Sequence, residues 1–89
     1  MKINQHYKLR RVTGENVIVR QGREGTDLTT ILTPNDTSCF LFDSLEGRDF
    51  TARDVEELLL SEYEIDEETV ARDTQKWISS LRHYGILED

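Results

Sequence analysis

The chain changes character at "LTPND", residues 32–36, and this junction limits the folds open to it. Upstream, β-prone runs at 7–12 and 17–19 flank the turn sequence "TGEN", which predicts a hairpin with Gly14 at a positive φ. "DLTTIL" predicts a third strand, which must end at Pro34 because proline cannot donate a hydrogen bond to a β ladder. Downstream, apolar residues recur at helical spacing. The pattern therefore predicts three strands followed by helices.

Capping residues mark where the first two helices begin and end. Asn35 or Asp36 can cap the first helix through a side-chain oxygen, and Gly47 suits its C-terminal end. Thr51 and Asp54 have the spacing of a capping box, which opens the second helix. The apolar face of the first helix consists of Phe40, Leu41 and Leu45. The buried stripe of the second consists of Val55, Leu58 and Leu59.

The third helix is the longest expected element. Three acids, Asp66–Glu68, crowd its start, where carboxylates favour the positive end of the helix dipole, and Gly85 ends it. Its amphipathic stripe follows i, i+4, i+7, i+8, i+11 spacing and consists of Val70, Thr74, Trp77, Ile78 and Leu81. We expect Trp77 to belong partly to the core.

Two local features stay open at this stage. The apolar alternation of the first strand breaks between Leu9 and Val12, which predicts a bulge or an irregular entry there. Phe42 points away from the predicted apolar face of its helix, so it is either an exposed aromatic residue or a second contact face.

Length and charge narrow the classes of protein. We expect 89 residues to form a single domain, 1–89, without a deep enclosed cavity. Residues 1–37 hold six Lys/Arg against four Asp/Glu, or +2, and residues 38–89 hold five against fourteen, or −9, for a net charge of −7. The sequence shows no apolar run long enough to span a membrane and no signal peptide. A single Cys39 fits a reducing compartment, and we expect a cytoplasmic protein.

No motif indicates catalysis, a metal site or a cofactor. Cys39 has no partner at catalytic spacing and is predicted to be a small core residue. His6 and His83 lie in separate segments without a second ligand, so they are predicted to be surface imidazoles. The carboxylates of 54–68 lack the pattern of a calcium loop and fit a solvated face. We therefore expect a protein that is not an enzyme.

Three kinds of interaction remain. The last two helices with their strands have the shape of a winged helix, which makes a DNA-binding regulator an alternative, although the acids on both helices would repel the phosphate backbone. "DLTTIL" has no Lys, Pro or inward charge, so as an edge strand it could accept an extended peptide as an additional strand. The same edge could instead pair in a homodimer.

The chain resembles the PqqD family (pyrroloquinoline-quinone biosynthesis protein D), the recognition elements for ribosomally made, modified peptides. The resemblance covers nearly the whole chain and rests on "YKLRRVTGENVIV", "LTPNDTSCFLFDSLEGRDFTARDVEELL" and "VARDTQKWISSLRHYGIL". It departs from the family pattern at Pro34, where Leu is frequent, and at Thr74, where an aliphatic residue is usual. Cys39 and Phe40 also stand where small or aliphatic residues are common.

The resemblance implies an α+β, winged-helix-like domain, with a three-stranded antiparallel sheet followed by three helices (β-β-β-α-α-α). It implies a non-catalytic adaptor that captures the leader of a precursor peptide by strand addition and presents it to a modifying enzyme, such as a radical S-adenosylmethionine protein. Nucleic acid and membrane are not expected as partners. The predicted peptide-binding residues are Asp27, Leu28, Thr29, Thr30, Ile31 and Leu32 on the strand, and Asp73, Lys76, Trp77, Ser80 and Tyr84 on the third helix. The other flank of that helix stays open as the groove wall: Ala71, Gln75, Ile78 and Arg82.

Overall fold

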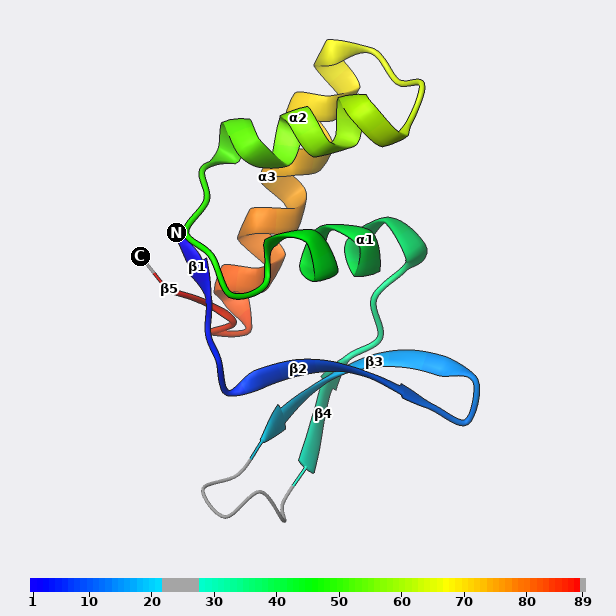
Figure 1. The fold of residues 1–89 in the computed structure, drawn as a ribbon, viewed down its shortest axis with the longest axis vertical. Coiled ribbons are helices and arrows are strands. Elements are labelled where there is room, and N and C mark those ends of the chain that lie inside the picture. The colour runs from blue at the N-terminus through cyan, green and yellow to red at the C-terminus, as the bar shows by residue number, and fades with distance from the viewer. Residues whose placement is uncertain (22–27, 89) are drawn as a thin grey trace.

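The computed structural model describes residues 1–21 and 28–88, and these form one α+β unit (Figure 1). The main sheet is antiparallel with strand order β2-β3-β4, and its strands are β2 (Tyr7–Val12), β3 (Glu15–Gln21) and β4 (Leu28–Leu32). The helices are α1 (Asp36–Leu45), α2 (Ala52–Glu62) and α3 (Glu67–His83). The predicted class and the order of these six elements are confirmed.

Two short strands that the sequence analysis missed tie the described ends of the chain together. β1 (Lys2–Ile3) pairs antiparallel with β5 (Leu87–Glu88). The backbone N–H of Phe50 donates to the carbonyl of Met1 at 2.8 Å, which adds the segment before α2 to this corner. The chain after Gly85 therefore includes a strand, and its partner lies more than eighty residues earlier in the chain.

The hairpin forms at the predicted turn, with Thr13 and Gly14 both at positive φ (52° and 80°). Such a turn matches the twist of the strands that it joins. The predicted bulge in the first strand is wrong, because the pairing of β2 with β3 is regular from Tyr7 to Val12. Val12 breaks the alternation for another reason: it lies beside the turn at the end of the hairpin and is 53% exposed.

The irregularity lies instead between β3 and β4. Ile18 is opposite Leu32, but the next residue of β3, Val19, is opposite Thr30. Ile31 therefore has no counterpart on β3 and forms a β-bulge. A bulge bends the strand that carries it, and here it precedes the passage of the chain into α1.

α1 lies between the sheet and α2 (Figure 1), and this position explains why Phe42 is buried. Phe42 is fully buried, together with Leu41 and Leu45, whereas Phe40 is half-buried and meets Tyr63 edge-on, with ring centroids 6.0 Å apart. Of the two possibilities for Phe42, the structure therefore shows the second: the residue forms another buried contact face of α1 and is not an exposed aromatic residue.

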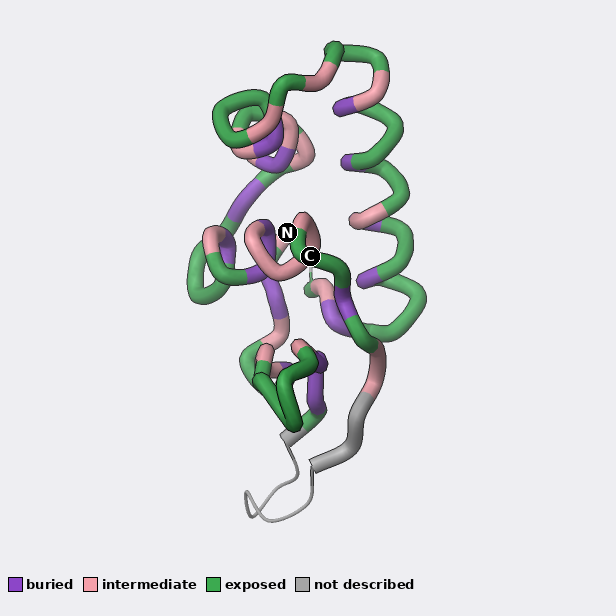
Figure 2. The backbone as a smooth tube through the Cα atoms, turned by 90° about the vertical axis from the view of Figure 1, so that its right-hand side faces the viewer, coloured by how far each residue is buried: buried purple, intermediate pink, exposed green. Residues whose placement is uncertain are grey.

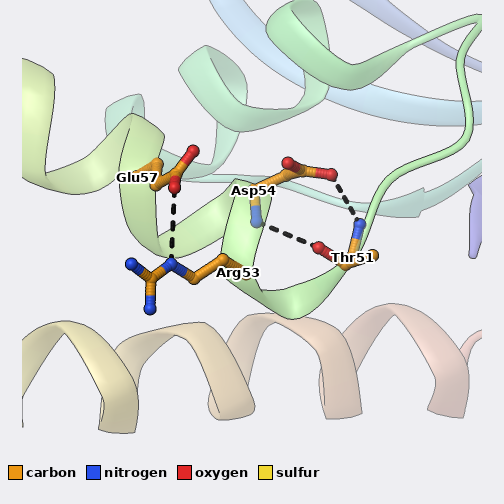
Figure 3. A network of polar contacts seen from close by, with 4 residues as sticks. All are labelled: Thr51, Arg53, Asp54 and Glu57. Carbon is orange, nitrogen blue, oxygen red and sulfur yellow. Dashed lines mark hydrogen bonds and ion pairs between the residues drawn. The ribbon is translucent and has the colours of Figure 1, made fainter.

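A side chain caps the start of each of the three helices, and the caps predicted for α1 and α2 are confirmed. Asn35 Oδ1 accepts the N–H of Ser38 at 2.8 Å, which settles the choice between Asn35 and Asp36. At α2 the capping box is complete: Thr51 Oγ1 accepts the N–H of Asp54 at 3.2 Å, and Asp54 Oδ2 accepts the N–H of Thr51 at 2.9 Å (Figure 3). Each cap satisfies backbone donors that the first turn of a helix leaves unpaired.

α3 covers the remaining side of the core. Asp66 caps it, accepting the N–H of Thr69 at 2.7 Å. Figure 2 shows that its buried positions face the other elements, while its outer side is exposed. Its buried residues are Val70, Thr74, Ile78 and Leu81, and Trp77 is half-buried. Within residues 1–21 and 28–88, the helices lack the combination of length and hydrophobicity that a membrane span requires.

Candidate functional site

The two edges of the main sheet differ in their protection against added strands. β2 forms one edge and carries Lys8, Arg10 and Arg11, a kind of charge that discourages further pairing. β4 forms the other edge, and its sequence "LTTIL" contains neither lysine nor proline. Among residues 1–21 and 28–88 no strand pairs with its outer side. Because basic side chains protect β2 and no lysine protects β4, β4 is the edge at which an additional strand could pair.

The bulge at Ile31 limits the length of this open edge. The regular pairing of β4 with β3 runs from Leu28 to Thr30, and Leu32 pairs again beyond the bulge. Ile31 and Leu32 are both half-buried and pack against the core. An added strand would therefore find a regular backbone only along Leu28–Thr30, and then meet a bend.

A cleft opens where β4 ends, and it has a volume of about 420 Å³. It lies between the segment leading from β4 into α1 and the side of α3. Its lining residues are Leu32, Thr33, Pro34, Asn35, Thr37, Ser38, Leu41, Leu59, Asp73, Lys76, Trp77 and Ser80. The end of the open strand and one flank of α3 thus face the same space.

Trp77 is the fixed wall of this cleft. Its indole Nε1–H donates to Ser38 Oγ at 2.9 Å, and the N–H of Ser38 in turn donates to Asn35 Oδ1. Its ring also packs against Phe50, with centroids 6.2 Å apart. The cap of α1 and the side of α3 are therefore joined by one chain of hydrogen bonds, which holds the indole half-exposed at the cleft.

The chemistry of the cleft is apolar at its base and charged at its rim. Leu41 and Leu59 are buried at 1% and 2% exposure. Asp73 and Lys76 are exposed on α3, and the ion pairs within the described part of the chain involve neither of them. Such a cleft offers an apolar side chain a place to be buried and offers two unpaired charges beside it.

The structure brings together some of the predicted site residues and separates others. Leu32, Asp73, Lys76, Trp77 and Ser80 line the cleft. Leu28, Thr29, Thr30 and Ile31 form β4. Asp27 lies outside the described residues.

Tyr84 is the predicted residue that stands apart. It is the C-cap of α3, 44% exposed, with its ring against His83, and it does not line the cleft. The alternative flank, Ala71, Gln75, Ile78 and Arg82, contributes no lining residue either, and Ile78 is buried in the core. Of the two flanks left open by the sequence, the first therefore borders the cleft.

The segment leading into α1 and one residue of α2 also line the cleft, and neither was among the predicted site residues. Thr33, Thr37 and Ser38 come from this segment, and Leu59 comes from α2. One signal was available: a half-buried Trp77 needs an acceptor for its indole N–H, and hydroxyl side chains follow Pro34 closely.

Cys39 lies on α1 and is half-buried rather than fully in the core. Burial raises the pKa of its thiol, and the nearby carboxylates of Asp36 and Asp43 raise it further. A thiol with a raised pKa is mostly protonated near neutral pH and is a poor nucleophile. Within the residues that the structure describes, no group of three or more His, Cys, Asp or Glu side chains could hold a metal ion.

The three-stranded sheet, the three helices and the cleft beside the sheet edge define a small winged-helix-like α+β domain. The family model described as coenzyme PQQ synthesis protein D (PqqD) matches residues 15–87. The chain belongs to the PqqD family, as the sequence motifs indicated.

Two solved structures share this fold. "TbiB1 in Complex with the TbiA(beta) Leader Peptide" aligns with a TM-score of 0.69 at 22% identity, covering 99% of this chain and 95% of that one. "Lasso peptide synthetase B1 complexed with the leader peptide" aligns with a TM-score of 0.69 at 23% identity, covering 99% of this chain and 96% of that one. A comparison with curated protein sequences finds no match.

Proposed function

We propose that the protein is a non-catalytic adaptor that binds the leader segment of a ribosomally made precursor peptide and presents it to a modifying enzyme in the cytoplasm. One observation carries this proposal: the sheet edge without protecting charges ends at a cleft lined by α3. Two structures of the same fold are complexes with leader peptides, which supports it. The PqqD family membership supports it as well.

The leader would bind in two parts. Backbone groups of Leu28–Thr30 would form a short ladder with the peptide, which supplies alignment and tolerates many sequences. Past the bulge, the peptide would leave β4 and place a side chain in the cleft between Leu32 and Trp77. Each hydrogen bond contributes about 0.5–1.5 kcal/mol net, whereas burying one large apolar side chain contributes about 1.5–3 kcal/mol. The cleft would therefore supply the selectivity.

Such an adaptor would act by raising the local concentration of substrate at its partner enzyme. A tethered peptide meets the enzyme at an effective concentration that the linker sets, without any catalytic group on the adaptor. A radical S-adenosylmethionine protein is one class of partner that fits this role.

The DNA-binding alternative lacks comparable support. α2 and the start of α3 carry Glu56, Glu57, Glu62, Glu67 and Glu68 on half-buried or exposed positions. Phosphate contacts supply most of the affinity of non-specific DNA binding, and these carboxylates oppose them. The homodimer alternative uses the same edge of β4 as the leader, so the two would compete.

Proline substitutions along β4 test the docking edge. Successive backbone N–H groups of an edge strand point alternately toward the neighbouring strand and away from it. Of Thr29→Pro and Thr30→Pro, one removes an outward donor and should keep the fold while weakening leader binding. The other removes a donor to β3 and should mainly destabilise the sheet.

The readout is the fluorescence of Trp77, the single tryptophan of the chain, during titration with synthetic leader peptides encoded beside its gene. Proline at Arg10 or Arg11, on the opposite edge of the sheet, is the matched control, and the folded one of these two variants should bind as the wild type does. Unchanged affinity in the folded β4 variant would show that the leader does not pair with this edge.

A further inference from the structure

We propose that the cleft selects leader segments in which a basic and an acidic side chain stand two residues apart, held by Asp73 and Lys76. This inference rests on the proposed function and deepens it, because it names a chemical feature of the peptide. It starts from two charges of opposite sign that line one cleft and pair with nothing in the described part of the chain.

Asp73 and Lys76 differ from other charged residues of α3 in lining the cleft without an ion-pair partner among the described residues. Glu68 and Arg72, on the same helix, pair with each other at 3.8 Å and do not line the cleft. Asp73 and Lys76 have the i, i+3 spacing at which helical side chains can meet, yet they form no ion pair with each other. Both side chains are exposed at the rim, so a ligand can reach them without unfolding any part of the structure.

The spacing of the two charges matches an extended peptide. Three residues of an α-helix rise about 4.5 Å along its axis. In a β-strand, side chains on one face recur every second residue, or about 6.6 Å. Flexible Lys, Arg and Glu side chains cover the difference of about 2 Å. A strand running along α3 would thus place side chains j and j+2 opposite Asp73 and Lys76.

The direction of the peptide decides the order of its charges. One direction calls for Lys/Arg-x-Asp/Glu and the other for Asp/Glu-x-Lys/Arg, so peptides that bind in a single direction share one of these orders. The side chain at j+1 then points to the opposite face.

The test is a selection of displayed random peptides on two forms of the protein. The first is the wild type, and the second is the charge swap Asp73→Lys with Lys76→Asp, which keeps the net charge at −7. Peptides selected on the wild type should share one order of charges two residues apart, and those selected on the swap should share the reverse order. A peptide selected on one form should bind the other about fivefold more weakly, the upper range for a partly exposed ion pair.

The matched control is the swap Glu68→Arg with Arg72→Glu on the same helix, which also keeps the net charge and lies outside the cleft. It should select the same peptides as the wild type. Thermal unfolding checks that both swaps are folded, as expected for substitutions of exposed side chains.

The outcomes separate this inference from the proposed function. Peptides that bind the wild type in the cleft but share no charge pattern, or that rank equally on the swap, would overturn the inference and leave the adaptor function standing. If no displayed peptide binds, and leader peptides leave the fluorescence of Trp77 unchanged, the adaptor function falls together with it.

Discussion

Replacing Thr74 with valine should stabilise the protein, although threonine and valine have nearly the same shape. Thr74 is fully buried on the inner face of α3, and its Oγ1 has no hydrogen-bond partner among the described residues. A buried hydroxyl without a partner costs about 1–3 kcal/mol relative to water. Valine replaces that hydroxyl with a methyl group, keeps the branching at Cβ and leaves no cavity.

We therefore expect Thr74→Val to raise the free energy of unfolding by about 1 kcal/mol, the lower end of this range. For a domain of this size, that change corresponds to an increase in Tm of about 4–8 °C. Urea unfolding followed by circular dichroism measures the free energy, and a thermal scan measures Tm. Leader binding should not change, because Thr74 does not line the cleft.

The variant Thr74→Ser provides the comparison, because it keeps the hydroxyl and removes the methyl group. It should lower the free energy of unfolding by about 1 kcal/mol through lost burial and a small void. A valine variant that is less stable than the wild type, with the same fold, would refute the reasoning and mean that the hydroxyl has a partner in solution.

Three further predictions concern the caps and the cleft wall. Asn35→Ala should lower the free energy of unfolding by about 1 kcal/mol in urea titration, because the N–H of Ser38 loses its acceptor; no change would mean that solvent caps α1 equally well. Trp77→Phe should lower the free energy of unfolding by about 1 kcal/mol, because the Nε1–H donor to Ser38 is lost. The same variant should bind leader peptides more weakly in calorimetry, and unaltered binding would mean that the indole does not contact the peptide. The hydrogen bond from the backbone N–H of Thr69 lowers the pKa of the Asp66 carboxyl. The ionised cap therefore stabilises the fold fully above the ordinary pKa of Asp, and this stabilisation is lost as the pH falls through the lowered pKa. Acid unfolding of Asp66→Asn, which caps without titrating, should therefore be less steep below about pH 4 in circular dichroism, and an identical acid profile would contradict the assignment.

The elements that could be predicted from the sequence are those fixed by local chemistry. Asn35, Thr51 and Asp54 begin their helices through hydrogen bonds that span three residues, so the sequence contains the whole interaction. Gly47 takes the positive φ (82°) that its position past α1 requires. The hairpin turn at Gly14 was predictable for the same reason.

The features that were missed or misplaced depend on contacts between distant segments. The pairing of β1 with β5 joins the two described ends of the chain, and neither dipeptide shows a strand pattern alone. Phe42 is buried because α1 lies between two layers, which the periodicity of one helix does not reveal. The bulge at Ile31 arises from how β4 leaves β3 to enter α1, whereas the irregular alternation near Val12 only reflects exposure at a turn.

The candidate site follows the same division. The strand and the flank of α3 that contains Asp73, Trp77 and Ser80 could be proposed from the resemblance and from helical spacing. The contribution of Leu59 could not, because α2 reaches the cleft only through tertiary packing. Tyr84 shares the helical flank in sequence, but α3 ends there and the chain turns toward β5.

Amide chemical shifts would show directly whether a leader peptide binds along β4 and the cleft. Isotope-labelled protein is titrated with synthetic leader peptides encoded beside its gene, and the backbone amides are followed at each step. A leader that docks on β4 and in the cleft should cause saturable shifts that concentrate at Leu28–Leu32, at the start of α1 and along Asp73–Ser80, with slowed hydrogen exchange at alternate residues of β4. Saturable shifts confined to β2 or to the acidic face of α2, or no shifts with any leader while duplex DNA shifts α3, would contradict leader docking at this site.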